Sequence, residues 1–269
     1  MRVNSSYRKL EAYLDTVQAS GRYYFTSQEV RDKLSLTTGS FRKQLLPLLL
    51  KNQIALIRNG FYVIVAPEYR AVGAPPVTYY IEGLMKVLNR PYYIGLLNAA
   101  AWYGAAHQQP QNYSIITLTP ALPDIKKEYA RIDFICKNRW DDRDIVQQKT
   151  NAGYVNASSP ELTAFDLCYY SKHAGGINQV ATVLQELVEE LDGRELIDTA
   201  KRYSNMMAVQ RTGYLLEFLG NQELVNPLKG WLKNQKYHAA LLDVSNKDHS
   251  SKITGNDWRI IVNTEIDPS

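Results

Sequence analysis

The sequence is poor in residues that build disulfide or metal frameworks. Its 269 residues include only two cysteines and four histidines. Cys136 and Cys168 lie far apart, with no C-x-x-C motif and no histidine at ligand spacing. This pattern predicts neither a zinc site nor a disulfide framework. We therefore expect two ordinary buried thiols and no bound metal.

Long hydrophobic runs are also missing. The sequence has no apolar stretch of roughly 18 residues, the length that a membrane-spanning helix needs. Its N-terminus lacks the apolar run that is typical of a signal peptide. We therefore expect a cytoplasmic protein without a membrane partner.

The common catalytic signatures are absent as well. The chain has no G-x-x-x-x-G-K-[ST], G-x-G-x-x-G, H-E-x-x-H or G-x-S-x-G motif, and its histidines are scattered. Pro123-Asp124 resembles the first half of a metal-dependent nuclease motif, but no separate acidic-x-Lys segment follows it. We expect no catalytic residues and no cofactor, and hence no enzyme.

Charge is distributed unevenly along the chain. Residues 1–90 carry 13 Lys and Arg against 6 Asp and Glu, which leaves 18 against 21 for the remainder. A basic module joined to a nearly neutral body is typical of a DNA-binding domain attached to a domain with another role. A basic solvated face without a partner is the alternative interpretation.

The basic part contains a pattern that is typical of a winged helix-turn-helix, between Thr26 and Val65. Thr26 and Glu29 form a T-x-x-E capping box at a helix start. A turn rich in hydroxyl groups follows, with Thr37 or Thr38 as the next N-cap. The preceding helix of this domain is predicted over residues 7–17.

The helix predicted after Thr37 or Thr38 has the composition of a recognition helix. Phe41, Leu45 and Leu48 lie on one apolar face, which turns Ser40, Lys43 and Gln44 away from the core and leaves Arg42 at its margin. Pro47 interrupts this pattern, so the helix either stops near Leu46 or kinks.

Two β-prone runs, residues 54–57 and 61–65, flank Arg58-Asn59-Gly60. Asn-Gly is the strongest short hairpin signal, so this segment is predicted to be the wing. Arg58 at its tip is expected near the DNA backbone or minor groove.

The fold class is therefore α+β, with a winged helix-turn-helix joined to a larger mixed α/β domain. We place the first domain at residues 1–65, a linker rich in Pro and Gly at 66–78, and the second domain at 79–269. Residues 92–106 are apolar nearly all round and are predicted to form one buried helix, the spine of that domain. Strands are predicted near 114–117, 131–135, 152–157, 239–244 and 258–262, with four or five helices after Ser158-Ser159-Pro160-Glu161.

Four segments together are similar to a known family. They are R-N-G-F-Y-V at 58–63, R-P-Y-Y-I-G-L-L at 90–97, S-S-P-E-L-T-A-F-D-L at 158–167 and Q-R-T-G-Y-L-L at 210–216. In this order they resemble the AbiEi antitoxins of type IV toxin–antitoxin systems, which act in abortive infection and phage defence. The resemblance covers nearly the whole chain.

The resemblance implies a protein with two functions. The winged domain would bind inverted repeats in its own promoter and repress transcription. The second domain would counteract a nucleotidyltransferase-like toxin without forming a stable complex with it. Carried over by position, the candidate DNA-binding residues are Thr37, Thr38, Ser40, Arg42, Lys43, Gln44, Arg58 and Asn59.

Glu161 and Arg211 are candidates for an antitoxin surface, with buried structural salt bridges as the alternative. The chain would act as a monomer or as a dimer aligned by DNA. Two other function classes stay open. One is a ligand-sensing winged-helix transcription factor, which the 19 tyrosines permit but do not demonstrate. The other is an enzyme that processes nucleic acid.

Overall fold

The computed structural model describes residues 5–105, 110–246 and 255–268, and contacts divide it into two compact units. The first unit comprises Met1–Tyr92, Leu122–Phe134 and Gln147–Val155, and the second comprises Tyr93–Ala121, Ile135–Val146 and Asn156–Ser269. The domain boundaries at residues 65 and 79 stay predictions. None of the helices in the described part of the chain has the length and apolar character needed to span a bilayer.

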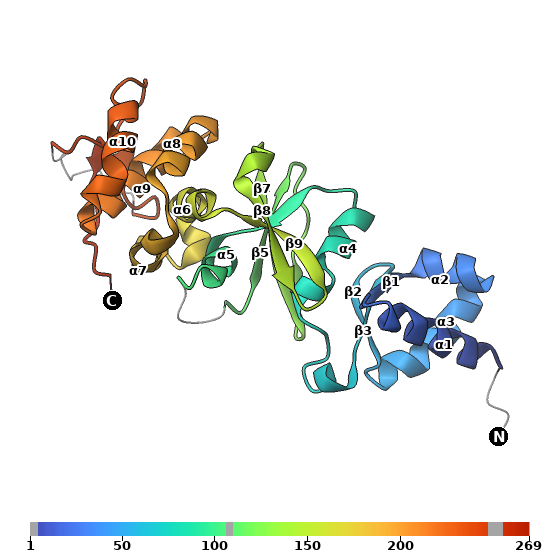
Figure 1. The fold of residues 1–269 in the computed structure, drawn as a ribbon. Coiled ribbons are helices and arrows are strands. Elements are labelled where there is room, and N and C mark those ends of the chain that lie inside the picture. Colours follow the sequence, from blue (N-terminus) through green and yellow to red (C-terminus); the bar gives the residue numbers. More distant parts are fainter. Residues whose placement is uncertain (1–4, 106–109, 247–254, 269) are drawn as a thin grey trace. The chain divides into compact units, whose positions relative to one another are not determined.

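The first unit begins with three helices and a small antiparallel sheet (Figure 1). Its sheet has the order β1-β3-β2. A core of aliphatic and aromatic side chains, including Leu10, Phe25, Val30, Phe41 and Leu45, joins the helices to the sheet. The elements are α1 Ser5–Ala19, β1 Tyr24–Thr26, α2 Ser27–Leu34, α3 Thr38–Leu50, β2 Ile54–Arg58 and β3 Phe61–Ile64.

Short-range capping signals fix the starts of α2 and α3, as predicted. The Thr26 hydroxyl accepts a hydrogen bond from the Glu29 N–H, and the Glu29 carboxylate accepts one from the Thr26 N–H. Thr37 caps α3 by accepting from the Ser40 N–H at 3.2 Å. The predicted hairpin is also present, and Gly60 in its turn has φ +77°, a conformation that favours glycine.

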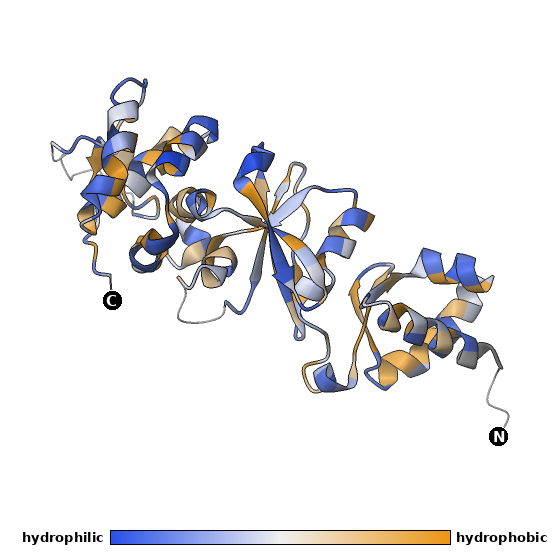
Figure 2. Cartoon of the chain, viewed as in Figure 1, coloured by the Kyte–Doolittle hydropathy of each residue, from blue (hydrophilic) through white to orange (hydrophobic). Residues whose placement is uncertain are grey.

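Helix α3 continues through Pro47 to Leu50. Of the two predicted alternatives, a stop near Leu46 is therefore wrong, and a kink at Pro47 stays a prediction. Pro47 is the tenth residue of α3, counted from Thr38, and about one helical turn follows it. The C-terminal half of α3 is hydrophobic (Figure 2). Within it, Leu46 and Leu50 are exposed.

Residues 67–92 cluster with the first unit. They form the 3-10 turns η1 Pro67–Tyr69 and η2 Val77–Tyr79 and the helix α4 Ile81–Val87. Gly83 of α4 lies against the Tyr24 ring, where an added Cβ would come within 2.1 Å of the ring atom Cζ. Glycine is therefore required for the close approach of α4 to β1.

A six-stranded sheet has the order β6-β7-β5-β4-β9-β8. It combines an antiparallel β6–β7 pair with a parallel β4–β9 pair, so the sheet is mixed, in keeping with the predicted α+β class. Its strands are β4 Tyr92–Ile94, β5 Tyr113–Leu118, β6 Ile125–Lys127, β7 Ala130–Lys137, β8 Ile145–Thr150 and β9 Gly153–Ser158.

The prediction of one helix over residues 92–106 is wrong. The segment forms β4 and then a separate helix, α5 Leu96–Trp102, while Ala106 lies outside the described residues. Gly95 between them has an extended backbone, and Leu96 has φ +53°, so helical geometry cannot run through this point. A short apolar run fits a buried strand as well as a buried helix, and the aromatic and β-branched residues of β4 favour the strand.

The remaining helices belong to the second unit and share one large core. They are α6 Pro160–Tyr169, α7 Ile177–Leu187, α8 Gly193–Arg202, α9 Met206–Phe218 and α10 Gln222–Leu232. Ser159 caps α6, with Pro160 in its first turn, as predicted. Gly193 begins α8, whose N-cap is Asp192. The short parallel strands β10 Ala240–Leu241 and β11 Ile260–Ile261 lie within the two predicted C-terminal strands.

Candidate functional site

The first turns of α3 carry most of the candidate DNA-binding residues. Thr37, Thr38, Arg42 and Lys43 are exposed, and Ser40 is half-buried. Because Thr37 caps the helix, the N–H groups of its first turn point outward at the positive end of the helix dipole. The exposed cations therefore lie next to backbone donors, an arrangement suited to phosphate.

Gln44 does not belong to this exposed set. Only 6 % of its surface is exposed, whereas the sequence pattern placed it away from the core. It lies three residues after Phe41 and four before Leu48, so it shares the margin of the buried face. Its amide Nε2 donates to the Ser40 hydroxyl oxygen at 3.2 Å.

The wing carries the other two candidates. Asn59 is exposed in the turn between β2 and β3, and Arg58 is half-buried. A guanidinium nitrogen of Arg58 lies 3.5 Å from the Pro123 carbonyl oxygen, within the first unit. The Tyr129 hydroxyl donates to the Leu56 carbonyl at 3.0 Å, so residues 122–134 hold the wing at two points.

We expect Tyr129→Phe to lower the free energy of unfolding by about 1 kcal/mol, because the Leu56 carbonyl loses a part-buried hydrogen bond. Urea denaturation measures this loss, with Tyr154→Phe, at an exposed tyrosine, as the control. Equal stability of Tyr129→Phe and the unsubstituted chain would show that the hydrogen bond does not hold the wing.

Asp124, the residue that resembled part of a nuclease motif, has a structural role. Its carboxylate accepts from the Phe134 N–H at 3.0 Å and pairs with Lys126 at 3.1 Å. Among the described residues, no group of three or more His, Cys, Asp or Glu side chains could hold a metal ion. His107 and His249 lie outside the described residues.

Glu161 and Arg211, the candidates for an antitoxin surface, are both buried, with 6 % and 4 % of their surfaces exposed. Glu161 accepts from the Asp192 N–H at 3.2 Å, and burial raises its pKa. Arg211 donates from Nε to the Leu241 carbonyl at 2.7 Å, and burial lowers its pKa. These side chains join elements in the interior and cannot themselves form a contact surface.

The second unit contains a buried polar cluster that the sequence patterns did not predict. Lys137 of β7 lies 2.6 Å from the Asp166 carboxylate of α6 and 3.1 Å from the Tyr93 hydroxyl of β4. Tyr93 and Tyr203 each donate to Asp166 at 2.6 Å. Lys137 also lies over the Tyr203 ring, with Nζ 4.4 Å from the ring centroid. Asp166 in an otherwise buried helix was a signal for a buried partner, but nothing in the sequence identified Lys137.

The charged groups of the cluster are not accessible to a ligand. Lys137 and Asp166 are 6 % and 0 % exposed, and their charged groups bind each other and the two tyrosines. Burial and the neighbouring Asp166 carboxylate raise the pKa of Tyr93 and of Tyr203 well above the usual value, so both stay protonated donors. The four residues therefore join β4, β7, α6 and the chain after α8.

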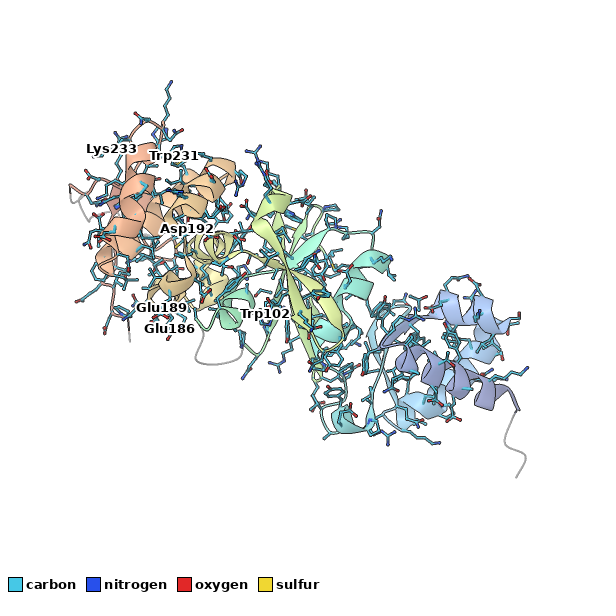
Figure 3. All side chains as sticks on the ribbon, in the orientation of Figure 1. Trp102, Glu186, Glu189, Asp192, Trp231 and Lys233 are labelled. Carbon is cyan, nitrogen blue, oxygen red and sulfur yellow. The ribbon has the colours of Figure 1, made fainter. Side chains whose placement is uncertain are left out.

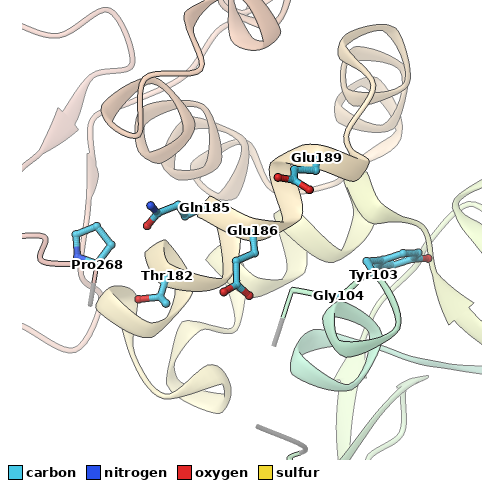
Figure 4. A pocket seen from close by; sticks show the side chains of 7 residues that line it. All are labelled: Tyr103, Gly104, Thr182, Gln185, Glu186, Glu189 and Pro268. Atoms are coloured by element: carbon cyan, nitrogen blue, oxygen red, sulfur yellow. The ribbon is translucent and has the colours of Figure 1, made fainter. Parts of the chain in front are cut away.

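The second unit also has a surface hollow of about 600 Å³. Tyr103 and Gly104 lie on one side, and Thr182, Gln185, Glu186 and Glu189 on the other, with Pro268 at its edge (Figure 4). Glu186 and Glu189 follow one another along α7 and the 3-10 turn after it (Figure 3). Two carboxylates at the rim repel phosphate, so the hollow is unsuited to a nucleotide.

Comparison with known proteins finds one family model that matches part of the chain. Residues 93–218 match the family model of the AbiEi antitoxin C-terminal domain. The fold is similar to that in the crystal structure of the RV2827C protein from Mycobacterium tuberculosis, with a TM-score of 0.65 and 16 % sequence identity. The structural alignment covers 96 % of this chain and 92 % of the mycobacterial chain. At this identity the likeness shows a shared fold. No curated protein matches the sequence.

Proposed function

We propose that the chain is a type IV antitoxin that also represses its own operon, because residues 93–218 match the family model of the AbiEi antitoxin C-terminal domain. The partner would be a nucleotidyltransferase-like toxin, counteracted without a stable complex. The family match supports the antitoxin part of the proposal. The proposal assigns no catalytic residue to the chain.

We further propose that the first unit is a winged helix-turn-helix that binds inverted repeats in its own promoter. The capped α3, with Arg42 and Lys43 exposed on its first turns, is the observation that carries this part. A recognition helix places its N-terminal residues against base edges and phosphates in the major groove. Thr37, Thr38 and Ser40 would supply neutral hydrogen bonds, and Arg58 and Asn59 would contact the backbone from the wing.

Three features support this assignment over a mere packing unit. The order of helices and strands is that of a winged helix, with α2 and α3 joined by a turn of three residues, 35–37. The excess positive charge lies in residues 1–90. The wing is held by residues 122–134, which makes it a fixed element that can present Asn59.

Co-expression tests the antitoxin part. Cells that produce the neighbouring toxin should recover growth when they also produce the full chain, and the two proteins should not copurify. The Arg42→Ala/Lys43→Ala chain should rescue growth equally well, because neither residue belongs to the family domain. Failure of the unsubstituted chain to rescue growth, at a level where both proteins are detected, would contradict the antitoxin role.

A further inference from the structure

Ser40 and Gln44 form a pair one helical turn apart on α3. The Ser40 N–H donates to the Thr37 hydroxyl oxygen at 3.2 Å, and the Ser40 hydroxyl oxygen accepts from Gln44 Nε2 at 3.2 Å. Ser40 is half-buried, whereas Gln44 is 6 % exposed. The buried amide therefore holds a hydroxyl that lies at the edge of the exposed turn.

The direction of this hydrogen bond follows from the orientation of the amide, whose nitrogen faces Ser40. In this orientation the Gln44 nitrogen donates and the Ser40 oxygen accepts. Gln44 is buried on the same side of α3 as Phe41 and Leu48, and it cannot turn outward without leaving this buried face. Within the described chain, its Oε1 is buried without a hydrogen-bond partner, so the amide is fixed by packing and by its bond to Ser40.

The consequence concerns the proton of the Ser40 hydroxyl. A serine inside a helix commonly donates this proton back to a carbonyl three or four residues earlier. In the residues that the structure describes, the Ser40 hydroxyl makes no such bond and accepts from Gln44 instead. Its proton is therefore free to be donated outward, next to the exposed Lys43.

We propose that Gln44 is a positioning residue, which keeps the Ser40 hydroxyl as a hydrogen-bond donor to an acceptor atom of the bound DNA. This inference rests on the proposed DNA-binding function. The acceptor is either a phosphate oxygen or the N7 of a purine in the major groove, since each accepts a hydrogen bond from a hydroxyl. Gln44 itself does not contact the DNA.

A double-mutant cycle on the full chain tests this role, with the DNA upstream of its own gene as the probe. Gln44→Met keeps a side chain of similar size and shape but cannot donate a hydrogen bond. Without that bond, the Ser40 hydroxyl can donate its proton to a backbone carbonyl of the preceding turn. We expect Gln44→Met to weaken binding about three- to tenfold when Ser40 is present, the effect of one hydrogen bond. In the Ser40→Ala background, the same substitution should change affinity by less than about twofold.

An equal effect of Gln44→Met in both backgrounds would overturn the proposal, because Gln44 would then act only on the fold of α3. Urea denaturation of all four chains checks that each is folded. Ser40→Thr is the conservative variant, since it keeps a hydroxyl that can accept and donate, and it should retain the coupling with Gln44. Loss of coupling in this variant would also count against the role.

Modified DNA distinguishes the two sources of the acceptor. A methylphosphonate at the contacted phosphate, or a 7-deazapurine at the contacted base, should remove the effect of Ser40→Ala at one position only. If no modified position removes that effect, Ser40 does not donate to the DNA and the proposal fails. If the unsubstituted chain shows no preference for the upstream DNA, the proposed function fails first, and this inference fails with it.

Discussion

Replacing Arg42 and Lys43 together by alanine should weaken binding to the upstream DNA by on the order of 10- to 100-fold at moderate salt. Both side chains are exposed on the first turns of α3, so their truncation leaves the core of the first unit intact. Each cation that neutralises a phosphate releases a counterion. The slope of log affinity against log salt should therefore become shallower by about two.

Two exposed lysines of the second unit provide a matched control for charge. Lys172→Ala/Lys233→Ala removes the same number of positive charges from outside the proposed interface. This variant should bind with nearly unchanged affinity and salt slope. If it loses as much affinity as Arg42→Ala/Lys43→Ala, DNA binding depends on the overall charge and the placement of the interface on α3 is wrong.

Lys137→Met should have the largest effect on stability, a loss of about 3–5 kcal/mol in the free energy of unfolding. The substitution leaves the Asp166 carboxylate buried with two tyrosine hydroxyls but without its cation. Removing one partner of a buried ion pair is strongly destabilising, because the remaining charge stays out of water. The tyrosines also lose their packing against the ammonium group, which lies over the Tyr203 ring.

Urea denaturation measures this loss, with Lys233→Met as the control at an exposed lysine. The control should stay within about 0.5 kcal/mol of the unsubstituted chain. A loss of less than about 1 kcal/mol for Lys137→Met would show that the cluster is hydrated or that the pair is not formed in solution. Since the cluster lies inside residues 93–218, rescue from the toxin should fall together with stability.

Local signals made part of the fold predictable from the sequence. The Thr26 capping box, the caps at Thr37 and Ser159 and the Asn59-Gly60 turn depend on neighbours within a few residues. Such signals are readable because their hydrogen bonds close within one turn of chain. The positions of α2, α3, the β2–β3 hairpin and α6 followed from them.

Features that depend on distant contacts were not predictable in this way. Lys137 and Asp166 are 29 residues apart, and no helical or strand period relates them. The separation of β4 from α5 depends on the Gly95 backbone, where an added Cβ would lie 2.7 Å from the Ile116 side chain. Gln44 lies at the edge of the apolar stripe of α3, where spacing alone does not decide between core and solvent.

Binding of the purified full chain to the DNA upstream of its own gene, across a salt series and against an unrelated duplex, tests the central proposal most directly. The proposal predicts a clear preference for the upstream DNA at every salt concentration, with affinity that falls steeply as salt rises. Equal, weak binding to both duplexes would contradict it, because the first unit would then be a basic domain without an operator.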